Sequence, residues 1–354
     1  MKPSIFLLPA ICLACLFSAC KPDFDLNASY EDVTVVYGIL NHQDSIHYVK
    51  IYRGYQSHEQ NGVFINAQNP DSIYYPVDQI EAYLREYQDS VTLTPRDRIP
   101  LDWTHDFPRD AGVFYYEKER IIYYTTDSLS KDMEYKIIIN HKLTGKRTEA
   151  QTPMVGDFRI TSSQEIRMPE SKGRVSFTKA PNTNAFGYEI HVNFLYFEVD
   201  KKTNQVVKLG RVRKNVTPRV GTEMEINSQG DYSMQFTQTF YEDIAAQLEI
   251  NDNVVRYMGR PGNNGVCIEM EGWAAGESFI KFLLSNRPTN SFVQVNTIYT
   301  NLSTPGGGLA FGFLSSRVKS SARTLSASGE SERELIGGAR TSHLGFKPWV
   351  EYKP

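Results

Sequence analysis

Two carboxylates at alternate positions of a predicted strand have the spacing needed for acid–base hydrolysis of a sugar linkage. Glu269 and Glu271 lie in the sequence VCIEMEGW. Side chains two residues apart on a strand share one face and lie about 7 Å apart, and inverting glycosidases hold their two carboxyl groups about 6.5–9.5 Å apart. Acid pairs of this kind are also common on exposed strand faces. Because no further residue supports hydrolysis, the sequence does not predict an enzyme.

Three other groups of reactive residues fall short of a catalytic or metal-binding pattern. Gly306–Gly308 is not followed by Gly-Lys-Ser/Thr, so it indicates a close backbone approach rather than a phosphate-binding loop. The seven histidines form no H-E-x-x-H or H-x-H motif, although His42, His47 and His58 can meet across a hairpin. Cys267 has apolar neighbours, which favour a buried, inert thiol over a reactive one. We expect no metal and no cofactor.

Cys20 is the residue whose surroundings predict a specific reaction. A lysine at position 2 precedes an apolar run over residues 5–17, the layout of a secretory signal and too short for a bilayer span of about 20 residues. The sequence FSAC, ending at Cys20, resembles the bacterial lipoprotein box. That resemblance implies cleavage after residues 1–19 and a covalent diacylglycerol and acyl lipid on Cys20. The alternative is a buried helix of a cytosolic domain.

The residues after Cys20 bear on where the lipid anchor is sorted. Lys21 stands where inner-membrane lipoproteins typically carry aspartate, and Asp23 and Asp25 follow. This pattern resembles the export signal with which Bacteroidota place lipoproteins on the outer face of the outer membrane. The alternative is that residues 20–31 are polar because they form a solvated tether. We expect an outer-membrane location, at the cell surface or on the periplasmic face.

Length, cysteine count and net charge limit the kinds of fold and partner that we expect. Removal of 19 residues from 354 leaves 335, enough for two domains, and Cys267 is then the only cysteine besides the lipidated one. No internal disulfide is therefore expected. The net charge is −3 and no polycationic run occurs, which argues against nucleic acid as a partner. The 21 tyrosines and 19 phenylalanines suit half-buried strands.

The pattern of strands and turns predicts a mainly β protein. Short β-branched and aromatic runs separated by turn residues predict an immunoglobulin-like β-sandwich over 32–155. A second β-rich domain over 156–318 carries two amphipathic helices, near 239–250 and 274–286, whose apolar residues recur at helical spacing. We expect 319–354 to be an irregular polar tail.

The order of these features is similar to a known family. After the lipoprotein box, the sandwich region and a helix around ESFIKFLLS comes YTNLSTPGGGLAFGFLSSR, starting at Tyr299. This resembles a stretch in Bacteroidota outer-membrane lipoproteins that are catalogued as a domain of unknown function. The resemblance implies an outer-membrane lipoprotein associated with a TonB-dependent β-barrel transporter, and it carries over no catalytic residues.

We therefore expect a non-enzymatic lipoprotein that acts as an accessory or interaction subunit of an outer-membrane β-barrel complex. The loops around 55–75 and 300–313 are the expected contact regions. A carbohydrate- or nutrient-binding lipoprotein that feeds a TonB-dependent transporter is the alternative. Candidate binding residues, whose aromatic members can equally belong to the core, are Tyr74, Tyr75, Trp103, Trp273, Tyr299 and Asn301.

Overall fold

The structure is a computed structural model. It describes residues 32–54, 69–107, 120–162, 165–166, 173–178, 184–216, 225–226, 232–236, 240–263, 265–286 and 298–353. The predicted signal peptide (1–19), the lipidation site Cys20 and the tether (20–31) lie outside these ranges, as do His58 and most of the predicted loop 55–75. None of the helices in the described ranges is long and apolar enough to cross a membrane.

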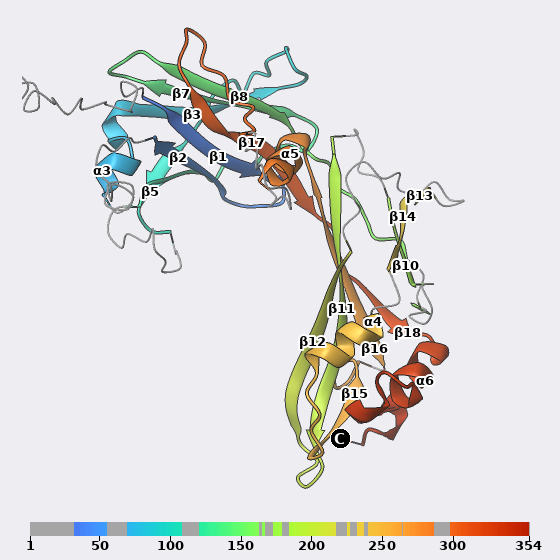
Figure 1. The fold of residues 1–354 in the computed structure, drawn as a ribbon. Helices are drawn as coiled ribbons and strands as arrows, with labels where there is room; N and C mark the ends of the chain where they lie inside the picture. Colours follow the sequence, from blue (N-terminus) through green and yellow to red (C-terminus); the bar gives the residue numbers. More distant parts are fainter. Residues whose placement is uncertain are drawn as a thin grey trace, which may run out of the picture.

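The N-terminal part is an immunoglobulin-like β-sandwich (Figure 1). Its elements are β1 (Thr34–Leu40), β2 (His47–Arg53), α3 (Pro70–Ile73), η1 (Val77–Gln79), β3 (Ile80–Tyr87), β4 (Ile99–Pro100), β5 (Asp102–Thr104), β6 (Ile122–Thr125), β7 (Glu134–His141) and β8 (Arg147–Pro153). One sheet has the order β5-β6-β2-β1 and the other β4-β3-β7-β8. These correspond to the ABED and CFG sheets of immunoglobulin domains, with β4 added at one edge. The predicted mainly β class is confirmed.

Alternating side chains build the core between these two sheets. In β2, His47, Val49 and Ile51 are buried, whereas Tyr48 and Lys50 are exposed, as expected for a strand with one face inward. β1 alternates in the same way, with its buried residues facing the second sheet. Burial of these apolar faces, at about 25 cal/mol per Å², is the main contribution to the stability of the sandwich.

A buried tyrosine fastens the corner that leads into β7. Tyr135 is fully buried, its hydroxyl donates to Glu86 Oε2 (2.6 Å) and it accepts from the Ser130 backbone N–H (2.7 Å). Burial, together with the hydrogen bond to Glu86, raises the pKa of Tyr135. A tyrosine near the start of this strand that bonds to backbone a few residues upstream is a hallmark of immunoglobulin-like domains.

Tyr135→Phe is expected to lower the free energy of unfolding by about 1–3 kcal/mol, because the buried Glu86 carboxylate and the Ser130 N–H each lose a partner. Tyr123→Phe is the matched control: Tyr123 lies in the same core, but its buried hydroxyl has no hydrogen-bond partner among the described residues. Its removal should be neutral or slightly stabilising. Urea denaturation of both variants measures the difference, and equal losses would contradict this role of Tyr135.

The second part of the chain is also β-rich. Its elements are β9 (Glu165–Ile166), β10 (Gly173–Phe177), β11 (Gly187–Asp200), β12 (Val206–Val216), β13 (Glu225–Ile226), β14 (Tyr232–Phe236), α4 (Phe240–Gln247), β15 (Val254–Met258), β16 (Val266–Ala275), α5 (Glu277–Ser285), β17 (Ala310–Lys319), β18 (Arg323–Ala327), α6 (Gly329–Gly337), η3 (Ser342–Leu344), β19 (Phe346–Lys347) and η4 (Trp349–Glu351). The sheet order is β19-β15-β11-β16-β17, with β12 on β11, β18 on β16 and β9 on β18; β10, β14 and β13 form a small separate sheet.

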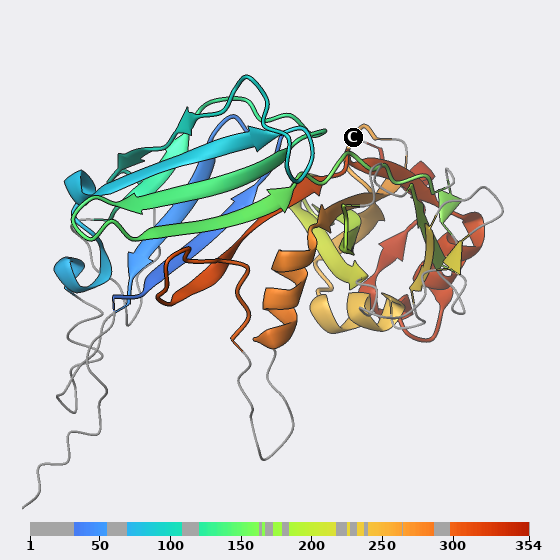
Figure 2. The same ribbon diagram turned by 90° about the horizontal axis from the view of Figure 1, so that it is seen from above.

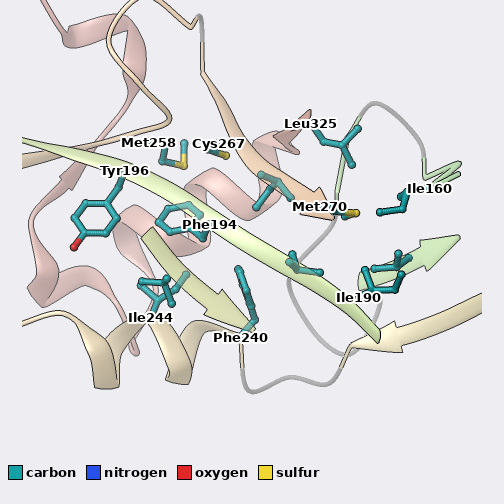
Figure 3. Close-up of a cluster of buried hydrophobic side chains, with 14 of the residues drawn as sticks. Ile160, Ile190, Phe194, Tyr196, Phe240, Ile244, Met258, Cys267, Met270 and Leu325 are labelled. Atoms are coloured by element: carbon teal, nitrogen blue, oxygen red, sulfur yellow. The ribbon is translucent and has the colours of Figure 1, made fainter. Parts of the chain in front are cut away.

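One hydrophobic core holds this second part together (Figure 3). Phe194 of β11, Met270 of β16 and Leu325 of β18 face Phe240 and Ile244 of α4 across it. The amphipathic helices predicted near 239–250 and 274–286 are therefore present as α4 and α5. α4 buries its apolar stripe in this core, while α5 packs Phe279 and Phe282 on Phe313 of β17.

Strand β17 joins the two parts into one continuous sheet of 12 strands (Figures 1 and 2). Residues 310–316 pair in parallel with β1, and residues 317–319 pair antiparallel with β16. The predicted division of the chain at residue 155 is therefore wrong for this strand, because its first half completes the immunoglobulin-like sheet and contributes Leu314 to that core. Pairing between such distant segments leaves no mark on local sequence.

Gly312 permits the close approach of β17 to β1. Its φ of 101° lies in the left-handed region, which side chains disfavour. A Cβ at this position would collide with the backbone carbonyl of Val36, the residue opposite on β1. Glycine is therefore needed here for two reasons: its backbone is left-handed, and a side chain would not fit between β17 and β1.

The segment predicted to be an irregular tail is instead ordered. β18, α6 and β19 lie within 319–354, so that prediction was wrong. α6 begins at the N-cap Ser328, whose side chain accepts from the Ser331 N–H, and it buries only Ser331 and Leu335. A helix that buries so little can be polar almost all round, which is why its sequence lacks a clear apolar stripe.

Candidate functional site

A concavity of about 370 Å³ lies at one end of the immunoglobulin-like sandwich. Aromatic and apolar side chains line it together with four polar ones, and its lining residues are Arg53, Pro70, Asp71, Tyr74, Tyr75, Pro76, Gln79, His105 and Ile121. Its volume lies within the range of about 300–1,000 Å³ that is usual for small-molecule sites. A smaller hollow of about 90 Å³ adjoins it and shares Tyr74 and Ile121.

Helix α3 places the two tyrosines. Asn69 caps it by accepting a hydrogen bond from the Asp71 N–H, and Pro70 occupies the first turn, where its missing N–H costs nothing. After one turn the chain becomes extended at Tyr74. Tyr74 and Tyr75 then pack inward and are only 8% and 6% exposed. Narrow strips of both rings therefore face the concavity.

Tyr75 is fixed by the first described residues of the chain. Its hydroxyl lies 3.0 Å from Asp32 Oδ1 and 3.2 Å from the Val33 carbonyl, and its ring packs on His141 at 4.6 Å. The Asp32 carboxylate also lies 3.5 Å from Arg53 Nε. The first described residues of the chain thus contact two residues of the wall, Tyr75 and Arg53.

Trp103 lies beside the concavity rather than in its wall. It is 43% exposed on the edge strand β5, and its ring contacts His105, which lines the concavity, at 5.2 Å. The structure therefore gathers three of the predicted binding residues, Tyr74, Tyr75 and Trp103, at one end of the sandwich. Of these, Trp103 has the largest accessible surface.

Arg53 and His105 are the site residues that the sequence analysis missed. Arg53 ends β2, and its guanidinium lies 6.0 Å from the centre of the Tyr75 ring. His105 follows Trp103 by two residues. In an extended segment, side chains two residues apart lie on the same side. The sequence WTH therefore contains the signal that places His105 beside Trp103.

The remaining predicted binding residues lie elsewhere. Trp273 of β16 packs against His191 at 4.6 Å and under the Lys319 ammonium at 5.1 Å. Asn301 makes internal hydrogen bonds instead, donating to the Leu314 carbonyl (2.8 Å) and accepting from its N–H (3.0 Å). The Tyr299 hydroxyl lies 3.1 Å from Ser278 Oγ on α5. Asn301 thus holds its segment against β17, and Tyr299 holds the same segment against α5.

The carboxylates of Glu269 and Glu271 are occupied by cations. Glu269 pairs with Arg211 (2.9 Å), while Glu271 pairs with Lys319 (2.8 Å) and Arg213 (3.4 Å). The hydrogen bond from Lys319 holds the pKa of Glu271 below its ordinary value. A general acid needs a raised pKa, so this arrangement suits a charged ladder across the sheet and not acid catalysis.

The other reactive groups are similarly placed. Cys267 is fully buried, as predicted, and burial raises its pKa to about 12. His42 pairs with Asp157 (2.8 Å), and burial lowers the pKa of His47. Among the described residues, no group of three or more His, Cys, Asp or Glu side chains is placed to hold a metal ion.

No protein-family model matches the chain, and neither does any curated protein.

Proposed function

We propose that this chain is a lipid-anchored outer-membrane protein that works by binding, as an accessory subunit of an outer-membrane β-barrel complex. The barrel is of the TonB-dependent class that the family-like stretch implies. The lipid on Cys20 would hold it at the membrane, at the cell surface or on the periplasmic face. Aromatic side chains at an accessible end of a rigid sandwich support a contact surface of this kind.

One observation carries the proposal: the concavity lies where the chain enters the fold. Asp32 contacts Tyr75 and Arg53 in its wall. Eleven residues lie between Cys20 and Asp32, so the tether spans at most about 43 Å even when fully extended. An anchored molecule therefore keeps this end close to the membrane, within reach of the loops of a barrel.

Cys20→Ala is expected to move the protein from the membrane fraction to the soluble fraction, because lipidation needs the thiol and acyl chains contribute about 0.8 kcal/mol per buried methylene. Fractionation of cells that express the tagged variant measures the change, with Cys267→Ala as the control that keeps the anchor. Unchanged partitioning of Cys20→Ala would contradict the lipid anchor. Protease added to intact cells then distinguishes the cell surface from the periplasmic face.

Trp103→Ala is expected to reduce recovery of a barrel partner at least tenfold in affinity purification of the tagged protein from detergent-solubilised outer membranes. Hot-spot aromatics of this kind contribute about 2 kcal/mol or more to binding. Val350→Ala is the control, since Val350 is 84% exposed in the second part of the chain. Recovery of the same barrel with both variants would place the contact elsewhere, and no barrel even with the wild type would refute the proposal.

The alternative is capture of a carbohydrate or another nutrient for a transporter, and the volume and lining of the concavity favour it. Trp103, 43% exposed beside the concavity, can stack on a sugar ring, while Arg53, Asp71 and Gln79 of its lining supply hydrogen-bonding groups of both charges. Glycan-array binding that disappears in Trp103→Ala would support this function. Absence of glycan binding by the wild type would remove it.

A further inference from the structure

Strand β12 presents an open edge on the second part of the molecule, away from the concavity. It is 11 residues long, and among the residues that the structure describes it pairs only with β11 (Figure 1). A long edge strand offers a row of unpaired N–H and C=O groups to another extended chain. Natural proteins use such edges to bind partners by adding a strand.

The hydrogen-bond pattern identifies the main-chain groups that face outward. The Leu195 carbonyl accepts a hydrogen bond from the Gly259 N–H on the β15 side, at 2.8 Å. The main-chain N–H and C=O of Leu195 therefore point toward β15 and away from β12. Leu195 lies opposite Arg211, and antiparallel pairs alternate between bonded and non-bonded. Gly210 and Val212 therefore bond to β11, whereas the N–H and C=O groups of Leu209 and Arg211 face the open edge.

The side chains of this edge are basic and partly apolar. Residues 200–216 contain six lysines and arginines and one acid, Asp200, within a chain whose net charge is −3. Val207 and Leu209 are 56% and 59% exposed. Arg211 and Arg213 pair with glutamates of β16, and Lys214 pairs with Asp243 of α4. Lys208 forms no ion pair with any described residue and lies 6.0 Å from the Tyr196 ring centre, so it is the cation of β12 that remains available to a partner.

These charges select the kind of strand that fits. Pairing of β12 with a second copy of itself would set cation against cation across the new ladder, which is destabilising. An acidic strand would complement them instead, and its apolar residues would cover Val207 and Leu209. We propose that the outer edge of β12 binds an extended, acidic segment of a partner protein by strand addition.

The test uses the full lipidated chain in detergent at physiological salt and a capped decapeptide of five Glu-Val repeats, with binding followed by fluorescence anisotropy. We expect saturable binding that falls at least tenfold in Lys208→Glu and at least tenfold when every second peptide nitrogen is methylated. A Lys-Val decapeptide should not bind. Equal binding of the methylated peptide would reduce the interaction to charge attraction, and no binding of the parent peptide would refute the site.

Amide exchange supplies a second readout that does not depend on a variant. Peptide binding should slow exchange of the outward-facing Leu209 and Arg211 amides, while the Gly210 and Val212 amides, already bonded to β11, stay unchanged. Peptide binding without that alternation would overturn strand addition. Because β12 lies in the second part of the chain, Trp103→Ala should leave peptide binding intact, which separates this proposal from the one above.

Discussion

Gly312→Ala is expected to lower the free energy of unfolding by about 3 kcal/mol or more. A left-handed backbone at a non-glycine residue costs about 1–3 kcal/mol. The added methyl group would also meet the Val36 carbonyl of β1, so β17 cannot keep its present distance from β1. Since β17 carries Leu314 into the core of the sandwich, the disturbance should reach both parts of the molecule. Thermal and urea denaturation of the variant measure the loss.

Gly306→Ala separates the two causes. Gly306 has a φ of 98°, close to that of Gly312, but a Cβ there would meet no atom of a described residue within 4 Å. This control should therefore lose only the conformational part, about 1–3 kcal/mol, and so less than Gly312→Ala. If both variants lost the same free energy of unfolding, the contact of the added methyl group with β1 would not contribute to the effect of Gly312→Ala.

Arg256→Met is expected to cost about 3–5 kcal/mol, the range for breaking a buried ion pair from one side. Arg256 is 3% exposed. Its Nε donates to Glu198 (2.9 Å), and its two terminal nitrogens donate to the carbonyls of Leu344 and Glu249, each at 2.7 Å. Methionine fills similar space but leaves a buried carboxylate and two carbonyls without a donor. Urea denaturation reports the change.

Two further variants show whether the cost is electrostatic. Adding Glu198→Gln to Arg256→Met removes the unpaired charge, so the double variant should be more stable than the single one. Arg340→Met removes an exposed pair, Arg340 with Glu242 at 3.4 Å, and should cost less than about 1 kcal/mol. A loss in Arg340→Met as large as that in Arg256→Met would rule out burial as the cause.

Local patterns predicted those elements whose side chains alternate or recur within a short window. β2 has one buried and one exposed face, and α4 buries Phe240 and Ile244 one turn apart; both are readable from sequence. α6 was missed because a polar helix that buries two residues has almost no periodic signal. β17 was assigned to one domain because its parallel pairing with β1 joins residues 276 positions apart, Thr34 and Ala310.

The candidate site was predictable in its residue types but not in its assembly. Their aromatic side chains marked Tyr74, Tyr75 and Trp103 as candidate binding residues. Their gathering at one end of the sandwich depends on the capped turn at Asn69 and on the contact with Asp32. Asn301 lies in a segment whose composition is typical of a binding loop, yet its side-chain amide hydrogen-bonds to the main chain of Leu314. Only the fold decides whether such a side chain faces a partner or its own backbone.

The sharing of β17 sets a time order on folding. Because β17 pairs with β1 from a position 276 residues further along the chain, this sheet cannot be completed until nearly the whole chain is available. Such non-local pairing slows folding, and until β17 docks, β1 presents an unpaired edge that invites aggregation. We expect β1 amides to gain exchange protection late in pulse-labelled refolding, after those of β3 and β7. The nascent chain would then expose this edge of β1 until nearly its whole length is available for folding.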